Sequence, residues 1–373
     1  MTSLSIIGCG FVSDLYMRSL ETFSDLSVGR VYDQDSERLK AFCAFWKTTP
    51  ANSLEDLLSD LAPGSIVLNL TNPSSHYEVS QTCLKAGHHV YSEKPLANEM
   101  DQAHKLHTLA KKKGLLLMSA PCSSLGESAQ VMGKAVRDGV AGTPRLVYAE
   151  LDDGFVPQAP YREWFSESGA PWPYKDEFIT GCTLEHAGYY LSWLIAIFGP
   201  VRRVVAASAA LIPDKTVETE TPDYSVASLF FESGVVARLT CSIVAPHDHQ
   251  IRIIGDKGVL AVKKAWDNSA PVRFHKRFRL RRRLMESPVG KRIRPKGATH
   301  PKLPRRGAAA MNFALGPKEM ADALVEGREC RLSSDFALHL NEVTLAIQNA
   351  GEDTGPQDMK TRCDLPEPMP WAQ

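Results

Sequence analysis

The fold is decided by the sequence LSIIGCGFVS, residues 4–13. A short apolar run ends at Gly8, and a helix-like pattern begins just after Gly10. Gly8 permits a tight turn, and Gly10 lets a phosphate group approach the backbone at the positive N-terminus of a helix. Ser13 stands at the third small position, where glycine or alanine is usual, and it is small enough for close packing. The stretch therefore predicts a nucleotide-binding turn between a first strand and a first helix.

Strand-like and helix-like patterns alternate through the N-terminal third of the chain. Apolar or β-rich runs occupy residues 4–7, 29–32, 66–70, 89–91 and 115–118. Helical patterns fill the intervals, at residues 12–20, 36–45, 76–85 and 100–113. Alternation at this spacing predicts βαβ units and a parallel sheet that is covered on both faces.

The second half of the chain has a different pattern. A helix is expected over residues 184–198, where Gly199-Pro200 ends it. Several strands in succession then imply an antiparallel or mixed sheet. They are expected at residues 201–211, 223–231, 235–243, 251–254 and 259–262, followed by closing helices at 317–326 and 335–350. A length of 373 residues fits two domains.

Asp33 stands at the end of the second expected strand. A carboxylate there accepts hydrogen bonds from an adenosine ribose and repels a 2′-phosphate, which favours NAD over NADP. Arg38 would counter this preference, but the sequence places it a helical turn or more further on. NAD is the expected cofactor, and NADP is the alternative.

Two more polar segments follow strands of the same expected sheet. Thr71-Asn72-Pro73 and His76 come after the third strand, and Glu93-Lys94-Pro95 comes after the fourth. Ligands collect at the carboxyl edge of a parallel sheet, so Lys94 could orient a nicotinamide ribose or bind a substrate oxygen. The alternative interpretation of Glu93-Lys94 is an ordinary solvated ion pair.

Together these residues resemble the Gfo/Idh/MocA oxidoreductases, named for glucose–fructose oxidoreductase and inositol dehydrogenase. The resemblance implies an N-terminal Rossmann domain at 1–122 and an α+β domain with a large open mixed or antiparallel sheet at 123–373, whose C-terminal helices pack back on the first domain. It implies hydride transfer between NAD(P) and a carbinol or ketone of a sugar, cyclitol or nucleotide-sugar derivative. It also implies a homo-oligomer, dimer or tetramer. The expected cofactor-binding residues are Gly8, Gly10, Phe11, Val12, Asp33, Thr71, Asn72, Pro73, His76, Glu93 and Lys94.

The resemblance also suggests where the substrate binds. Family members carry an Asp and, four residues later, a catalytic His on one helix. With Gly181 and Gly188 as anchors, His186 falls at the Asp position and Tyr190 at the His position. Spacing of four residues puts both on one helical face. The hypothesis is that Tyr190, with Lys94, exchanges the carbinol proton while His186 binds a neighbouring hydroxyl or tunes Tyr190. A core histidine bonded to backbone and simple aromatic packing are the alternatives.

Aromatic residues precede that helix in proline-rich loops. Such loops form stiff surfaces with polar edges, suited to the C–H faces of a sugar ring; the alternative is a hydrophobic plug at the domain junction. The expected substrate-binding residues are Lys94, Tyr161, Trp164, Trp172, Tyr174, Thr183, His186 and Tyr190.

The charge of the chain is balanced but unevenly distributed. Overall, 43 Lys and Arg offset 43 Asp and Glu, yet residues 272–306 hold 14 Lys and Arg and one acidic residue, Glu286. Three interpretations stay open for this basic segment: a solvated mobile insertion, a site for an anionic ligand or acidic partner, or a nucleic-acid or membrane-surface patch. The interleaved Phe274 and Phe278 are too few to indicate base stacking, so nucleic acid is the least favoured partner.

Other classes of protein are disfavoured. Cys182 and His186 lack further ligands at metal-binding spacing, so no metal site is expected. There is no G-x-S-x-G elbow, signal peptide or apolar run of membrane-spanning length, and a cytoplasmic location is expected. Two alternatives to a dehydrogenase remain: a catalytically silent NAD-binding sensor, and an NAD-dependent glycosidase on the same fold.

Overall fold

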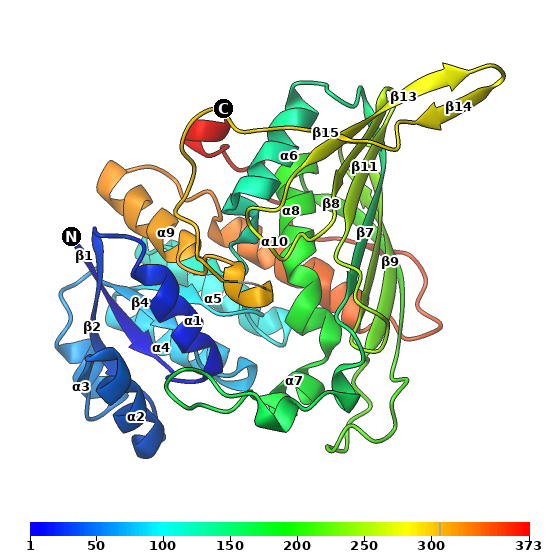
Figure 1. The fold of residues 1–373 in the computed structure, drawn as a ribbon. Coiled ribbons are helices and arrows are strands. Elements are labelled where there is room, and N and C mark those ends of the chain that lie inside the picture. The colour runs from blue at the N-terminus through cyan, green and yellow to red at the C-terminus, as the bar shows by residue number, and fades with distance from the viewer. Residues whose placement is uncertain (306) are drawn as a thin grey trace.

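A computed structural model describes residues 1–305 and 307–373 and contains two sheets (Figure 1). The first sheet has six strands, all parallel, in the order β3–β2–β1–β4–β5–β6. This is the strand order of a dinucleotide-binding Rossmann fold. The strands are β1 Thr2–Ile7, β2 Leu26–Tyr32, β3 Thr49–Pro50, β4 Ile66–Asn69, β5 His89–Ser92 and β6 Leu117–Ser119.

Helices cover this sheet because its central strands are apolar on both faces. Every residue of β4 and β5 is buried. Capping residues set where individual helices begin and end. The Asp35 side chain accepts from the backbone N–H groups of Glu37 and Arg38, and Gly87 ends another helix at φ 93°. The helices are α1 Phe11–Leu20, α2 Ser36–Trp46, α3 Leu54–Ser59, α4 His76–Ala86 and α5 Met100–Lys113.

The second sheet is a ten-stranded mixed sheet. Its path runs β14–β13–β12–β11–β7–β10–β9–β8–β16, with β15 paired to β13, and β7 and β10 are its parallel neighbours. The expected fold class, a Rossmann domain followed by an α+β domain with a large mixed sheet, is confirmed. The strands are β7 Pro144–Asp152, β8 Val201–Ala209, β9 Tyr224–Phe231, β10 Val236–Ser242, β11 Ile251–Gly255, β12 Gly258–Val262, β13 Arg273–Leu280, β14 Arg283–Glu286, β15 Lys291–Arg292 and β16 Gln357–Asp358.

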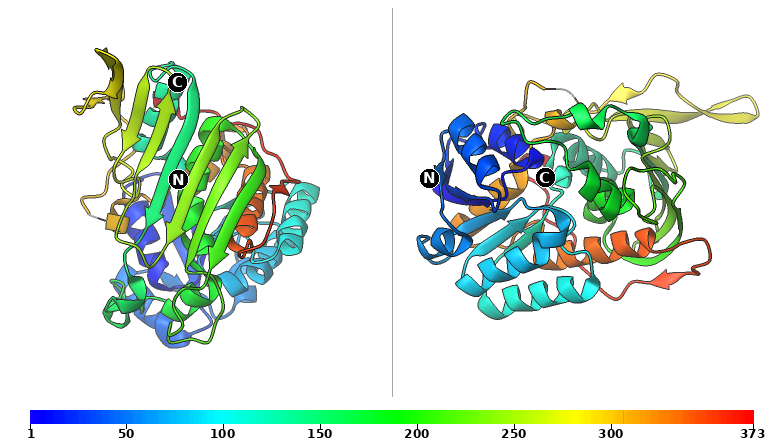
Figure 2. Two further views of the ribbon diagram at one scale, coloured as in Figure 1. Left: turned by 90° about the vertical axis from the view of Figure 1, so that its right-hand side faces the viewer. Right: turned by 90° about the horizontal axis from the view of Figure 1, so that it is seen from below.

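Helices lie along one face of this second sheet, and the left view in Figure 2 looks onto the other face with no helix in front of it. Alternating burial along β9 fits a sheet with one packed face and one open face. The helices of this part of the chain are α6 Glu127–Arg137, α7 Tyr174–Thr180, α8 Gly188–Phe198, α9 Leu315–Glu326 and α10 Ser334–Gln348.

The last two helices contact the N-terminal domain. A side chain at Gly316 of α9 would put its Cβ 2.3 Å from the ring of Tyr91 on β5, so only glycine fits this approach. Asp335 at the start of α10 pairs with His107 (2.7 Å) and Lys111 (2.9 Å) of α5. These contacts fix the two sheets relative to each other around the space between them.

The basic segment 272–306 is partly built into the sheet. Strand β13 pairs with β12 and then continues with β14 into a hairpin that projects from the body (Figure 1). The interpretation of this segment as an insertion beyond the last strand is therefore wrong for residues 273–280. Its final residue, Arg306, lies outside the described residues.

Within the described part of the chain, no helix combines the length and the apolar character needed to cross a membrane.

Candidate active site

Two cavities lie where the domains meet. The smaller, about 400 Å³, is lined from the first domain by the Gly10 turn and Lys94, and from the second by Glu185 and Tyr189. The larger, about 1150 Å³, lies against the second sheet. Both cavities are lined by Phe11, Trp172, Glu177, His186 and Trp266.

The glycine turn fits a dinucleotide. Gly8 has φ +96°, and a Cβ there would lie 2.6 Å from the carbonyl of Leu70, so glycine is required. A Cβ on Gly10 would meet no atom within 4 Å, which leaves open space at the N-terminus of α1. Phe11 and Val12 also line the smaller cavity. Backbone N–H groups of a ten-residue helix facing open space are suited to a pyrophosphate.

Asp33 does not line either cavity, but its carboxylate secures the turn. It accepts hydrogen bonds from the backbone N–H of Cys9 (2.7 Å) and of Asp35 (2.8 Å). Arg38 reaches it as well, with Nη1 3.5 Å from Asp33 Oδ2 and Nη2 3.2 Å from Asp35 Oδ2. The expectation that Arg38 lies too far from Asp33 to matter is therefore wrong, and Arg38 lines the smaller cavity.

Lys94 forms an ion pair with Glu185, a residue that was not among those predicted from the sequence. The side chains are 17% and 3% exposed, respectively. Burial disfavours the ammonium, but the Glu185 carboxylate outweighs burial and raises the pKa of Lys94. Lys94 is therefore held as a cation at the cavity wall. Glu93 fixes its loop, because Glu93 accepts from Tyr16 Oη–H (2.6 Å) and from the backbone N–H of Lys94 (3.0 Å).

His76 is fully buried and does not line either cavity. Its ring nitrogens lie 2.7 Å from the Pro95 carbonyl and 2.9 Å from the Thr71 carbonyl. It therefore joins two loops of the site. Thr71, Asn72 and Pro73 line the smaller cavity. The Asn72 side-chain amide donates to Asp176 on α7 (2.8 Å), which brings a helix of the second domain over the first.

Tyr190 lies outside both cavities, contrary to the hypothesis that it faces Lys94. It is 1% exposed, its hydroxyl has no hydrogen-bond partner among the described residues, and burial raises its pKa. Tyr189 lines the smaller cavity instead, with its ring 4.4 Å from that of Trp266. Burial raises the pKa of Tyr189, and Lys94 opposes the rise.

Residues Thr183–Ala187, which precede α8, form a π-helix rather than the first turns of the α-helix expected over residues 184–198. The four-residue spacing itself holds, because Glu185 and Tyr189, which line the cavity, are also four residues apart. Glu185 and Tyr189 line the cavity together with Lys94. Each lies one residue before the member of the pair, His186 and Tyr190, that alignment on Gly188 had selected. Thr183, expected to bind substrate, is fully buried, with its hydroxyl 2.8 Å from that of Ser225.

His186 lies between the cavities and two carboxylates. Its Nδ1 is 3.0 Å from Asp153 Oδ2, an ion-pair contact without hydrogen-bond alignment, and its Nε2 is 3.7 Å from Glu177 Oε2. Burial opposes a charged ring, but Asp153 and Glu177 outweigh it and raise the pKa of His186 to about 9. Burial, reinforced by the charge of Glu185, raises the pKa of Glu177 to about 7.

The aromatic loops contribute three of their four selected residues to the cavity walls. Tyr174 lines the smaller cavity, Trp164 the larger and Trp172 both. Tyr161 is 6% exposed and packs against Tyr174 and Phe178, with ring centroids 5.1 and 5.4 Å away. The plug interpretation therefore fits Tyr161, and the stacking interpretation fits the other three.

The basic segment contributes little to the cavities. Among its described Lys and Arg residues, Arg305 lines the larger cavity, together with Lys263 and Lys264 from the segment that follows β12. The residues of the hairpin β13–β14 line neither the smaller nor the larger cavity.

Family models match both parts of the chain. "Oxidoreductase family, NAD-binding Rossmann fold" matches residues 3–120, and "GFO/IDH/MocA C-terminal domain" matches residues 129–261. The chain belongs to the Gfo/Idh/MocA family. It is an oxidoreductase with an NAD-binding Rossmann domain, as the sequence resemblance implied.

Its relatives are distant. It is 27% identical over 249 residues to D-apiose dehydrogenase of Paraburkholderia graminis, with 64% of this chain and 60% of that protein covered. It is 22% identical to myo-inositol 2-dehydrogenase of Thermotoga maritima, with 68% and 73% covered. The solved WlbA dehydrogenase of Bordetella pertussis, in complex with NADH and UDP-GlcNAcA, has a TM-score of 0.70 at 20% identity, with 96% and 98% covered. The similarity to the WlbA structure shows that the two chains share a fold.

Proposed function

We propose that this protein transfers a hydride between the nicotinamide of NAD and a carbinol or ketone carbon of a sugar, cyclitol or nucleotide-sugar derivative. The observation that carries the proposal is the shared wall of the smaller cavity. Gly10 and Asn72, suited to a dinucleotide, line the same space as the Lys94–Glu185 ion pair and Tyr189. A cofactor and the reacting carbon of a substrate can therefore meet there.

These side chains have distinct roles in the proposed chemistry. The nicotinamide, when bound, supplies or accepts the hydride. Lys94, kept cationic by Glu185, donates a hydrogen bond to the reacting oxygen and stabilises negative charge on it. Tyr189 exchanges the proton of that oxygen, the role that the sequence had suggested for Tyr190. His186 and Glu177 bind a neighbouring hydroxyl.

The groups around the reacting oxygen hold their protons at neutral pH. The pKa of Lys94 and that of Tyr189 are both raised, the first by Glu185 against burial and the second by burial. A site that is protonated at rest is prepared to donate a proton, as reduction of a ketone requires.

NAD is the proposed cofactor, with NADP as the alternative. The Asp33 carboxylate follows β2 and accepts from Cys9 N–H in the glycine turn, and a carboxylate at this place in a Rossmann domain favours NAD. Arg38, which could neutralise a 2′-phosphate, is already paired with Asp33 and Asp35.

The cavities support a sugar-like substrate larger than one ring. Trp172 and Tyr174 offer aromatic surface beside the Lys94 wall, and Trp172 continues into the larger cavity. Stacking on such surface suits the C–H face of a sugar. The curated relatives named above act on an apiose and an inositol, and the solved neighbour holds a nucleotide sugar.

The test is a thermal-shift screen of polyols, keto sugars and nucleotide sugars with NAD or NADH present. Compounds that raise the melting temperature are then assayed at the absorbance band of reduced nicotinamide. Turnover on a sugar derivative is expected. A panel with stabilising ligands and no turnover would favour the silent NAD-binding sensor, and cleavage of glycosides without net NADH would favour the NAD-dependent glycosidase.

We also propose that the protein is a cytoplasmic homo-oligomer, a dimer or tetramer. The open face of the second sheet (Figure 2) supplies a surface for self-association. Light scattering of the purified protein tests the oligomeric state.

A further inference from the structure

We propose that Asp153, His247 and His249 bind a divalent transition-metal ion of the zinc type, with a free coordination position facing the larger cavity. No metal site was expected from the sequence. The three residues come from two segments that are far apart in the sequence, and the second sheet brings them together.

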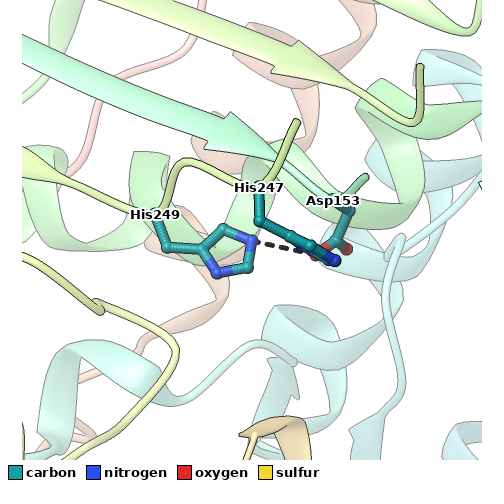
Figure 3. A group of neighbouring side chains, drawn as sticks. All are labelled: Asp153, His247 and His249. Carbon is teal, nitrogen blue, oxygen red and sulfur yellow. Dashed lines mark hydrogen bonds and ion pairs between the residues drawn. The ribbon is translucent and has the colours of Figure 1, made fainter. Parts of the chain in front are cut away.

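The sheet topology explains the juxtaposition. Asp153 directly follows β7, and both histidines lie in the segment that joins β10 to β11. Strands β10 and β11 flank β7 in the sheet, so the connection between them must pass the end of β7. Each side chain offers a ligand atom, and these atoms lie within 4.8 Å of one another (Figure 3). The group thus lies at the end of β7, where the sheet brings its two segments together.

The individual distances suit a shared ion. Asp153 Oδ1 lies 2.9 Å from His249 Nε2 and 4.0 Å from His247 Nδ1. Two imidazole nitrogens and one carboxylate oxygen form a donor set of catalytic zinc sites, which leave one position open. Nitrogen donors disfavour Mg²⁺ and Ca²⁺, which prefer oxygen ligands.

Trp266 lies beside two of the three proposed ligands. Its indole N–H can only donate, and it lies 2.9 Å from His249 Nε2, which accepts in the tautomer that carries its hydrogen on Nδ1. Asp153 Oδ1 is a second acceptor, 3.3 Å from the same N–H and 2.9 Å from the same nitrogen. In that tautomer His249 Nε2 has a lone pair directed at the group, as a metal ligand requires.

The cluster is connected to the proposed active site. The second oxygen of Asp153 lies 3.0 Å from His186 Nδ1, and His186 lines both cavities. All three ligands line the larger cavity, so the free position faces any substrate group that extends into it. The ion would there bind a carboxylate or a pair of hydroxyls. This role rests on the proposed function, whereas metal binding itself does not.

Calorimetric titration of the chelator-treated full-length protein with zinc chloride tests the proposal. We expect about one ion per chain, and at least about tenfold weaker binding in His247→Ala and in His249→Ala. His247 has a 70% exposed side chain, so its replacement leaves the fold intact. His104→Ala, which removes an exposed histidine on α5, is the matched control and should bind as the wild type does.

Cobalt gives a second readout that does not depend on activity. Co²⁺ held by two nitrogens and an oxygen should show visible absorption of a four-coordinate ion, and His249→Ala should abolish it. Absence of stoichiometric binding, wild-type binding by the His247 and His249 variants, or loss of binding in His104→Ala would each overturn the site. A protein that binds zinc but transfers no hydride would contradict only the proposed function.

Discussion

Tyr189 and Tyr190 are neighbours in the sequence, but Tyr189 lines the cavity that holds Lys94 whereas Tyr190 is 1% exposed and lines neither cavity. Both belong to the first turn of α8, so their side chains point in different directions around the same helix. The pair therefore provides a matched test of the proposed proton exchange.

Tyr189→Phe should lower kcat by about 10²–10⁴, the usual contribution of general acid–base catalysis. Tyr190→Phe should leave kcat unchanged and hold or raise the melting temperature, because it removes a buried hydroxyl without a partner among the described residues. Steady-state kinetics and thermal unfolding of both variants check this. Equal loss of kcat in the two variants would be inconsistent with the assignment.

Glu185→Gln should weaken catalysis through Lys94. The carboxylate raises the pKa of Lys94 against the effect of burial, so its removal lowers that pKa. The alkaline limb of the kcat profile for reduction should then move to lower pH, with the KM of NADH little changed. A profile that keeps its wild-type position in this variant would show that Glu185 does not control the charge of Lys94.

Helices α1, α2, α4 and α5 of the first domain could be predicted because their signals are local, whereas the short α3, Leu54–Ser59, was not recognised. The pattern over residues 100–113 matches α5, Met100–Lys113, and Gly114 ends it at φ 66°. The glycine turn and Asp33 were likewise identified from neighbouring residues. These parts of the site depend on a strand, a turn and a helix that are contiguous in the chain.

The rest of the site depends on contacts that spacing cannot reveal. Strand β7, which ends beside Asp153, was not recognised, and His249 meets that aspartate from 96 residues away. Glu185 was passed over because alignment on Gly181 and Gly188 selected His186 and Tyr190, one residue later than the pair Glu185 and Tyr189 that lines the cavity. Pairing across the sheet is set by the packed structure.

Glu177→Gln should stabilise the protein at alkaline pH. Burial and Glu185 raise the pKa of Glu177 to about 7, above its value in the unfolded chain. The native state then binds more protons than the unfolded state between about pH 4.3 and 7, so stability falls as the pH rises through that window. Because glutamine does not ionise, Glu177→Gln does not lose stability as the pH rises through this window.

We expect Glu177→Gln to gain on the order of 1–3 kcal/mol in free energy of unfolding at about pH 8, and little at about pH 4. Denaturant unfolding of both proteins at the two pH values measures this gain in the free energy of unfolding. Glu163→Gln replaces an exposed glutamate and is the control. It should leave the free energy of unfolding unchanged at both pH values. A gain of equal size at both pH values would rule out this explanation.

Asp33→Asn should shift cofactor preference toward NADP. The change removes the charge that repels a 2′-phosphate and keeps an oxygen to accept from Cys9 N–H. The ratio of kcat/KM for NADP to that for NAD should rise about tenfold. Asp35→Asn, which also loses a partner of Arg38, should shift the ratio less. An equal shift in both variants would assign the preference to Arg38.

The turnover of Lys94→Met tests the proposed active site more directly than any other measurement. Oxidation of NADH is followed with a substrate identified in the screen, and NADH binding is measured separately. We predict at least about 10²-fold lower kcat with NADH affinity within about threefold of wild type, because Lys94 acts on the reacting oxygen. A variant that keeps kcat within about threefold of wild type would contradict the proposed active site.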